Sequence, residues 1–180
     1  MSRSLRTGII LKQPIQSAER HRLRELTGFA LLAALLIVSK EAMQFLPNIE
    51  PVTLLLLLAA ERYGWKALYP TYVFVLVEGL LYGFHLWFFS YLYVWAIWVA
   101  LVIALRRFSH PLLWAILAGL FGLLFGTLCS LPYWIIGGAA AAVSWIIAGL
   151  SFDLVHAAGN LVIVGILYLP LSTALKKLPQ

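Results

Sequence analysis

Long apolar runs, each bounded by charged or turn-forming residues, recur along almost the whole chain. A helical span of a bilayer needs about 20 predominantly apolar residues. Of the 180 residues, 63% are hydrophobic and only 11% are charged. The pattern predicts an all-α integral membrane protein with six transmembrane helices. The predicted spans lie near residues 27–46, 51–63, 67–84, 87–105, 111–131 and 152–174.

Two stretches depart from simple spans. The second run is uninterrupted only from Val52 to Ala60, so it must use flanking residues, tilt, or be covered by neighbouring helices. The stretch from Ser130 to Ser151 contains a proline, several glycines and an alanine run. We expect it to form a partly helical flap over the outer mouth, because irregular backbone near a membrane is tolerated where it packs on protein or lines a cavity.

Positive charges divide unequally between the two sides of this arrangement. Twelve of the 13 Lys and Arg residues fall on one side, which the positive-inside rule assigns to the cytoplasm. Both termini then lie in the cytoplasm. The sequence thus predicts a basic cytoplasmic N-terminal arm, residues 1–25, and a six-helix transmembrane domain, residues 26–177. Because no small-residue cleavage site follows the basic N-terminus, we expect a retained span rather than a signal peptide.

Polar residues lie in or at the outer ends of three predicted spans, where charges are costly and usually face a cavity or each other. Asp153, His156 and Asn160 have the i, i+3, i+7 spacing that places them on one helix face. Each could contact a ligand or belong to an internal network in which Asp153 fixes His156 and Asn160 bridges helices. For the group we favour a binding site. The other charged residues at these ends are Lys40, Glu41 and Glu78.

Aromatic residues form a stripe down the fourth predicted span. The stripe consists of Trp87, Tyr91, Trp95 and Trp98. It is either a packed helix seam or the wall of a pocket for a large planar ligand. Trp134 and Trp145 lie in the predicted flap, and Trp87 and Trp134 also fit an interfacial aromatic belt.

Small residues four apart allow two helix backbones to approach closely. Ala30 and Ala34 form such a pair in the first span, and Ala118, Gly122 and Gly126 continue the pattern in the fifth. For the fifth span we expect packing within the molecule. For the first span an external partner helix is an alternative.

The sequence contains no phosphate-binding loop, no HExxH, no GxSxG and no Cys/His cluster. The single Cys129 excludes an internal disulfide. We therefore expect neither a metal nor an intrinsic cofactor, and no enzymatic activity. An intramembrane enzyme that uses Asp153 and His156 is the alternative class, and a structural or assembly protein is a third.

The order and spacing of several motifs resemble a known family. These motifs are Ala30-xxx-Ala34, Pro-Asn-Ile-Glu-Pro at 47–51, Glu-Gly-Leu-Leu-Tyr-Gly-Phe at 78–84 before an aromatic span, and Phe-Asp-Leu-Val-His at 152–156 before Gly159 and Asn160. Together they make the chain similar to the substrate-binding S component of energy-coupling factor (ECF) transporters, a type of ABC transporter. The resemblance covers residues 26–177 in architecture.

This resemblance implies a transport subunit of the bacterial cell membrane that captures a vitamin at the outer face. Its partners would be a transmembrane coupling subunit, which meets Ala30 and Ala34, and two ATP-binding-cassette ATPases, which hydrolyse the ATP. The candidate substrate-binding residues are Glu41, Asn48, Glu78, Tyr82, Trp87, Tyr91, Trp95, Trp134, Trp145, Asp153, His156 and Asn160.

The outer half contains four acidic residues against one lysine, which disfavours an anionic vitamin such as pantothenate or folate. An acidic, aromatic site suits a bulky ligand with hydrogen-bond donors. Within the family the chain looks most like the cobalamin-specific members of lactobacilli, so cobalamin is the expected substrate. The alternative is a queuosine precursor or another nitrogenous ring, whose amino groups Asp153 or Glu78 would accept while a tryptophan stacks on the ring.

Overall fold

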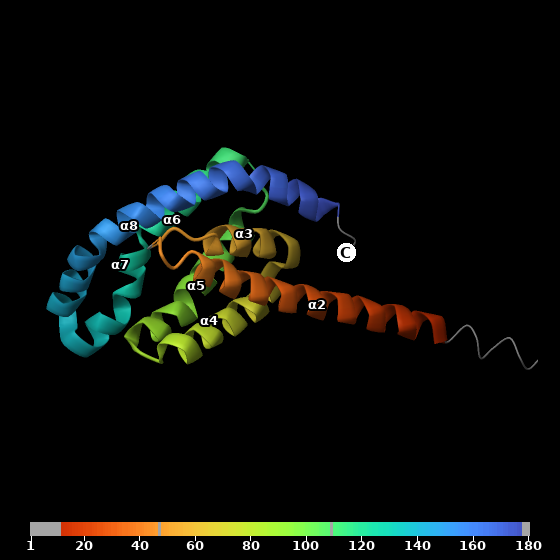
Figure 1. Ribbon diagram of the computed structural model, residues 1–180, viewed down its shortest axis with the longest axis horizontal. Helices are drawn as coiled ribbons and strands as arrows, with labels where there is room; N and C mark the ends of the chain where they lie inside the picture. Colours follow the sequence, from red (N-terminus) through yellow and green to blue (C-terminus); the bar gives the residue numbers. More distant parts are fainter. Residues whose placement is uncertain (1–11, 47, 109, 178–180) are drawn as a thin grey trace, which may run out of the picture.

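The computed structural model describes residues 12–46, 48–108 and 110–177, which are almost entirely helical and contain no strand. This confirms the predicted all-α fold class. Figure 1 shows the elements in chain order. They are α2 (Lys12–Ala42), α3 (Val52–Tyr63), the 3-10 helix η1 (Gly64–Ala67), α4 (Leu68–Tyr82), α5 (Leu86–Leu105), α6 (Pro111–Leu123), α7 (Phe125–Cys129) and α8 (Leu131–Lys176).

Two of the described helices, α5 and α8, are long and apolar enough to cross a membrane. The helices α3, α4 and α6 have 12, 15 and 13 residues. At 1.5 Å per residue they are roughly 18 to 22 Å long, which is less than the ~30 Å hydrocarbon core of a bilayer. Every predicted span is therefore helical over most of its length, but the number of membrane crossings stays a prediction.

The helix α2 passes without a break through residue 25, where the sequence places the end of the basic arm. Its first half extends away from the other helices (Figure 1). Side chains from Ala18 to Arg24 are exposed, whereas Ala33 and Leu36 are buried against the bundle. The arm and the first span thus share one helix, and the location of the arm stays a prediction.

The short helix α3 is the most completely enclosed element. Every residue from Val52 to Ala60 is buried, and α2, α5 and α8 all pack against this helix. Trp98 donates a hydrogen bond from Nε1 to the carbonyl oxygen of Thr53 at 2.9 Å. Neighbouring helices therefore cover this short run, and the helix also continues past it through the flanking residues to Tyr63.

The last two predicted segments need correction. The fifth, predicted as one span over 111–131, is interrupted at Leu124 and forms α6 and α7. The predicted flap, 130–151, is not separate from the last span, because residues 139–151 continue directly into the helix that contains Asp153. The run of four alanines at 139–142 favours helix and supplies nothing to end it.

A sharp bend divides α8 at Gly138, whose φ of 74° and ψ of −172° are not helical. Such a positive φ is readily adopted by glycine alone. In a straight helix the 12-residue separation between Tyr133 and Trp145 would be roughly 18 Å, but their rings stack with centroids 4.0 Å apart. The first turns of α8 therefore fold back onto the part of the helix around Trp145.

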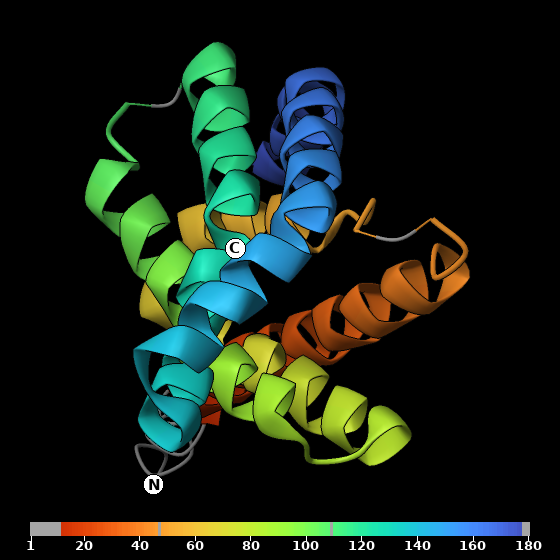
Figure 2. The ribbon, with the colours of Figure 1, turned by 90° about the vertical axis from the view of Figure 1, so that its left-hand side faces the viewer.

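The helix α6 lies along α8, as Figure 2 shows. Small residues allow this contact. A Cβ atom at Gly122 would lie 2.8 Å from the backbone carbon of His156, and one at Gly119 would lie 3.4 Å from the carbonyl oxygen of Ala157. The close packing predicted for the small residues of this span is confirmed, and it fixes the position of α8 beside the candidate site.

Candidate functional site

A cleft of about 430 Å³ opens between the start of α5, the short helix α7, the middle of α8 and the segment that precedes α3. We call it the α5–α8 cleft. Five of the predicted substrate-binding residues lie in its wall, and they come from three separate parts of the chain. The lining residues are Asn48, Trp87, Tyr91, Phe125, Gly126, Cys129, Trp145, Ala148, Gly149, Phe152 and Asp153.

Asp153 is the acidic group of this cleft and is only 5% exposed. Its Oδ1 accepts a hydrogen bond of 2.9 Å from the backbone N–H of Gly126, in the first turn of α7. The break at Leu124 frees this N–H from its usual partner within a continuous helix. Gly126 has no side chain, and a Cβ there would collide with the carboxylate. The interruption of the predicted fifth span is thus what provides the donor for Asp153.

The aromatic stripe on α5 has two different surroundings. Its outer members, Trp87 and Tyr91, line the cleft and have ring centroids 5.1 Å apart. Its inner members, Trp95 and Trp98, are fully buried, and Trp95 packs on Phe125 at 5.4 Å. Both interpretations of the stripe therefore apply, because the outer half forms a pocket wall and the inner half forms a helix seam.

Trp145 and Asn48 close the cleft from other directions. The stacking on Tyr133 holds the ring of Trp145, and its buried Nε1 has no hydrogen-bond partner among the described residues. Asn48 has a positive φ of 59°, a conformation that Asn tolerates better than most residues. Its Nδ2 donates to the carbonyl oxygen of Phe152 at 3.2 Å, which ties the segment before α3 to α8.

His156 and Asn160 share a buried face of α8 with Asp153, as their spacing predicts, but they do not line the cleft. Asn160 donates from Nδ2 to the carbonyl oxygen of Ala118 at 3.2 Å and so bridges α8 to α6. Asp153 does not fix His156. Neither ring nitrogen of His156 has a hydrogen-bond partner among the described residues, and the ring packs against Phe125 at 4.9 Å.

Three other predicted site residues form a separate group, which we call the α2–α4 polar cluster. Glu78 is fully buried and pairs with Lys40, while Tyr82 donates its hydroxyl proton to Glu41. One buried oxygen of Glu41 and one of Glu78 have no partner among the described residues. The cluster joins the C-terminal ends of α2 and α4 and does not line the α5–α8 cleft.

Glu50 connects the two groups electrostatically. Burial raises its pKa to about 7; the Lys40 charge opposes this rise, and the charges of Glu78 and Glu41 add to it. The charges of Glu50 and Glu78 also act on Tyr91 in the cleft wall. Glu50 and Glu78 therefore link the polar cluster to Tyr91 electrostatically, although the pKa of Glu50 is raised and Glu78 is paired with Lys40.

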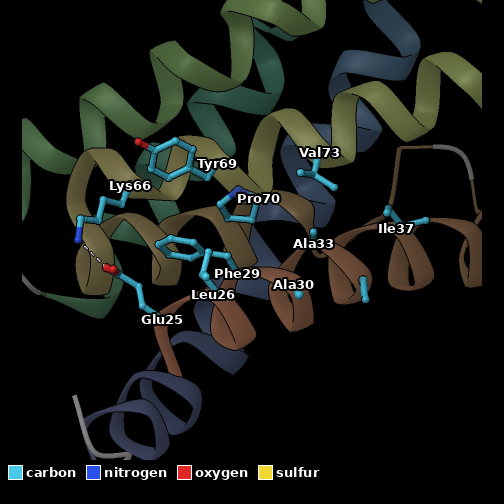
Figure 3. A pocket seen from close by; sticks show the side chains of 11 residues that line it. Glu25, Leu26, Phe29, Ala30, Ala33, Ile37, Lys66, Tyr69, Pro70 and Val73 are labelled. Carbon is cyan, nitrogen blue, oxygen red and sulfur yellow. Dashed lines mark hydrogen bonds and ion pairs between the residues drawn. The ribbon is translucent and has the colours of Figure 1, made fainter. Parts of the chain in front are cut away.

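The remaining predicted residues lie outside both groups. Trp134 is 55% exposed on the first turn of α8 and does not reach the cleft. Ala30 and Ala34 line a groove of about 770 Å³ between α2 and α4. Figure 3 shows Ala30 on α2 and Pro70 and Val73 on the facing part of the groove, with the Lys66–Glu25 ion pair at one end. Both alanines are exposed, so a partner helix has access to them.

Sequence reasoning missed several residues of the cleft wall, among them Phe125, Gly126, Cys129 and Phe152. The signal for Gly126 was present, because it belongs to the small-residue pattern of the fifth predicted span. Nothing in the spacing indicated that Cys129 or Phe125 would face Asp153, since that depends on the break at Leu124. Among the described residues no group of three or more His, Cys, Asp or Glu side chains is placed to hold a metal ion.

Comparison with known proteins gives no relative. No family description, no curated protein and no solved structure matches this chain.

Proposed function

We propose that this chain is the substrate-binding S component of an ECF-type transporter, and that the α5–α8 cleft is where it captures its ligand. The observation that carries the proposal is the meeting of a buried carboxylate, Asp153, with the aromatic rings of Trp87, Tyr91 and Trp145 in one cleft. In this proposal the six helical segments cross the membrane with both termini inside, and the cleft lies at the outer face.

The chemistry of the wall favours a planar ligand that donates hydrogen bonds. Oδ1 of Asp153 is used by Gly126, and no hydrogen bond from the described residues reaches Oδ2. A carboxylate oxygen in a protein interior interacts strongly with an N–H or O–H donor, because the local dielectric is low. Three aromatic residues in the wall, Trp87, Tyr91 and Trp145, can pack against a flat ring.

The size of the cleft bears on the choice of substrate. Pockets for small molecules typically measure about 300–1,000 Å³, and this cleft is at the lower end with about 430 Å³. Cobalamin combines a corrin macrocycle with a nucleotide tail and is bulky for such a space. The volume and the acidic wall together favour the alternative, a queuosine precursor or another nitrogenous ring with amino groups.

The same proposal assigns ATP hydrolysis and coupling to other subunits. The chain has no phosphate-binding loop, so ATP hydrolysis belongs to two partner ATPases. The transmembrane coupling subunit would meet the exposed Ala30 and Ala34 on α2. An enzyme is less well supported, because a catalytic base needs a hydrogen-bonded nucleophile or orienting group, and His156 has no such partner among the described residues.

Native mass spectrometry of the protein purified after growth in rich medium tests the proposal. We expect a retained small molecule with a flat nitrogenous ring. The change Asp153→Asn removes a charged acceptor, and hydrogen bonds to charged groups contribute about 1.5–3 kcal/mol, so retention should fall at least tenfold. The change Trp145→Ala should have a similar effect.

The matched control is Trp134→Ala, which removes an exposed tryptophan of the same helix and should leave retention unchanged. A consistently empty protein contradicts the site. So does a molecule that Asp153→Asn and Trp145→Ala both retain as well as the unmodified protein does. Purification without any ATPase partner from cells that express the whole transporter argues against the transport role and favours a structural or assembly protein.

A further inference from the structure

A second cleft, of about 440 Å³, lies where α2 and α3 meet the C-terminal part of α8. We call it the α2–α3–α8 groove. Figure 1 shows α3 between α2 and the last turns of α8. The groove is about 20 residues further along α8 than Asp153, which corresponds to roughly 30 Å of helix. Its apolar walls include Leu31, Leu35, Leu55, Leu58, Leu171 and Ala174.

Polarity in this groove is confined to one end. Nearly all lining side chains are aliphatic, and the exceptions are Arg62 and Tyr63. Arg62 donates from Nη1 to the carbonyl oxygen of Leu175 at 2.8 Å, and its guanidinium lies 5.6 Å from the ring centroid of Tyr63. The other end, near Leu35 and Leu55, is apolar.

The polar end carries a net positive charge. Arg24 precedes Gly28 by one turn on α2, and Lys176 and Lys177 directly follow Leu175 on α8. Two carboxylates are nearby. Glu25 pairs with Lys66 at 2.7 Å. Glu61 accepts the hydroxyl proton of Tyr168 at 2.7 Å and also interacts electrostatically with Lys176, which leaves the positive charges of Arg24, Arg62 and Lys177 in excess. An anionic group is therefore favoured at this end.

The walls and the charge of the groove favour a lipid over a partner helix as the occupant. From Arg62 to Leu55 the groove follows α3 for roughly 10 Å at 1.5 Å per residue. A hydrocarbon chain is thin and matches the aliphatic walls along this length. An anionic headgroup matches the positive charge at the polar end.

We propose that this groove is a binding site for an anionic phospholipid, with an acyl chain along the leucines of α2 and α3 and the phosphate at Arg62, Lys176 and Lys177. The groove is accessible from the side, since Leu31 is 67% and Leu35 is 50% exposed. Juxtamembrane basic clusters attract anionic lipids. The proposal requires that the chain lie in a membrane, but not that it be a transporter.

Native mass spectrometry of the full-length protein in detergent tests this site. The protein is incubated with equal amounts of phosphatidylglycerol and phosphatidylcholine that have the same acyl chains. We expect retention of the anionic lipid to exceed that of phosphatidylcholine at least fivefold. Replacing Lys176 and Lys177 by Gln should bring the ratio towards one. Equal retention of the two lipids by the unmodified protein overturns the proposal.

Larger side chains that fill the groove test whether the acyl chain binds there. Ala174→Phe introduces a larger side chain from α8, and Leu31→Trp introduces one from α2. Two independent variants are used so that the result does not depend on the folding of either one. Each should reduce lipid retention at least fivefold. The controls, Thr173→Phe and Val38→Trp, alter exposed neighbours that do not line the groove, and should retain lipid normally.

Undiminished retention in both filled variants overturns the proposal. A dimer that both filled variants abolish also overturns it and assigns the groove to a second copy of the chain.

Discussion

At the scale of single residues, the side chains fall into those that hold the bundle together and those that line the cleft. Asn160 bridges α8 to α6, and Glu78 is neutralised by Lys40 inside the protein. Asp153 does both, because it holds the first turn of α7 and also lines the cleft. Polar residues at the same end of the bundle therefore have different roles, and composition alone does not separate them.

The ion pair of Lys40 and Glu78 leads to a stability prediction. Glu78 is fully buried, so Lys40→Met leaves a carboxylate without its partner, which costs about 3–5 kcal/mol. We expect a clear loss of thermal stability in detergent, measured by a fluorescence or scattering melt. The double change Lys40→Met with Glu78→Met should recover most of the loss, because it removes both buried charges.

The matched control is Lys66→Met. Lys66 pairs with Glu25 in a more exposed ion pair, in which the side chain of Lys66 is 55% exposed. Exposed pairs contribute about 0–1 kcal/mol, so this change should have little effect. Equal losses for Lys40→Met and Lys66→Met would show that burial of Glu78 does not govern the stability of the polar cluster.

The spacing in the sequence was sufficient to place Asp153, His156 and Asn160 on one face, because a helix fixes that relation locally. It could not show what the face contacts. The contact depends on the register between α8 and the pair α6 and α7, which is set by glycines far away in the sequence. Trp134 was predicted to lie in a flap over the outer mouth; it lies instead in the first turn of α8, outside the cleft that the sequence assigned to it.

At the scale of elements, close packing of α6 on α8 determines the position of the site. Gly122 faces the backbone of His156, and Gly126 faces the carboxylate of Asp153. The sequence indicated this contact through its small-residue pattern. It did not indicate the break at Leu124 or the bend at Gly138, because several glycines and a proline occur in the same region and only some of them interrupt a helix.

Replacing Gly122 by Ala tests the packing of α6 on α8. The new Cβ would lie 2.8 Å from the backbone carbon of His156, so the two helices must separate. Overpacking of this kind typically costs about 1–3 kcal/mol, which should lower the melting temperature and weaken ligand retention through Asp153. A thermal melt combined with native mass spectrometry measures both effects.

Gly165→Ala provides the control at the same helix interface. Its Cβ would meet Ala115 at 3.7 Å, an ordinary van der Waals contact. Because Ala has a higher helix propensity than Gly by about 1 kcal/mol, this variant should be as stable as the original protein or slightly more stable. Destabilisation of the same size in both variants would contradict the argument that Gly122 is specifically required.

At the scale of the whole molecule, short helices are enclosed and long helices form the periphery. The 12 residues of α3 are surrounded by α2, α5 and α8, whereas much of the 46-residue α8 is exposed. Exposed apolar surface of this extent fits contact with lipid. The all-helical class was predictable from the apolar runs. The number of crossings was not, because it depends both on the length of each helix and on whether neighbouring helices cover it.

Cysteine labelling in intact cells tests the six-span arrangement. The background carries Cys129→Ser, which removes the natural thiol. Single cysteines replace Gln44 and His85, on the predicted outer side, and Lys66 and Phe108, on the predicted inner side; these four residues are exposed. A membrane-impermeant maleimide should label the first two in intact cells and the last two only after the membrane is opened.

Each pair of neighbouring positions tests one helix. Labelling of His85 and Phe108 on opposite sides shows that α5 crosses, as its length of 20 residues and its apolar composition allow. Labelling of Lys66 and His85 on opposite sides shows the same for α4. With 15 residues this helix can cross only if it stands nearly upright or if the bilayer is locally thinner. Labelling of these two on the same side contradicts six crossings and makes α4 a helix that enters the bundle without spanning the membrane.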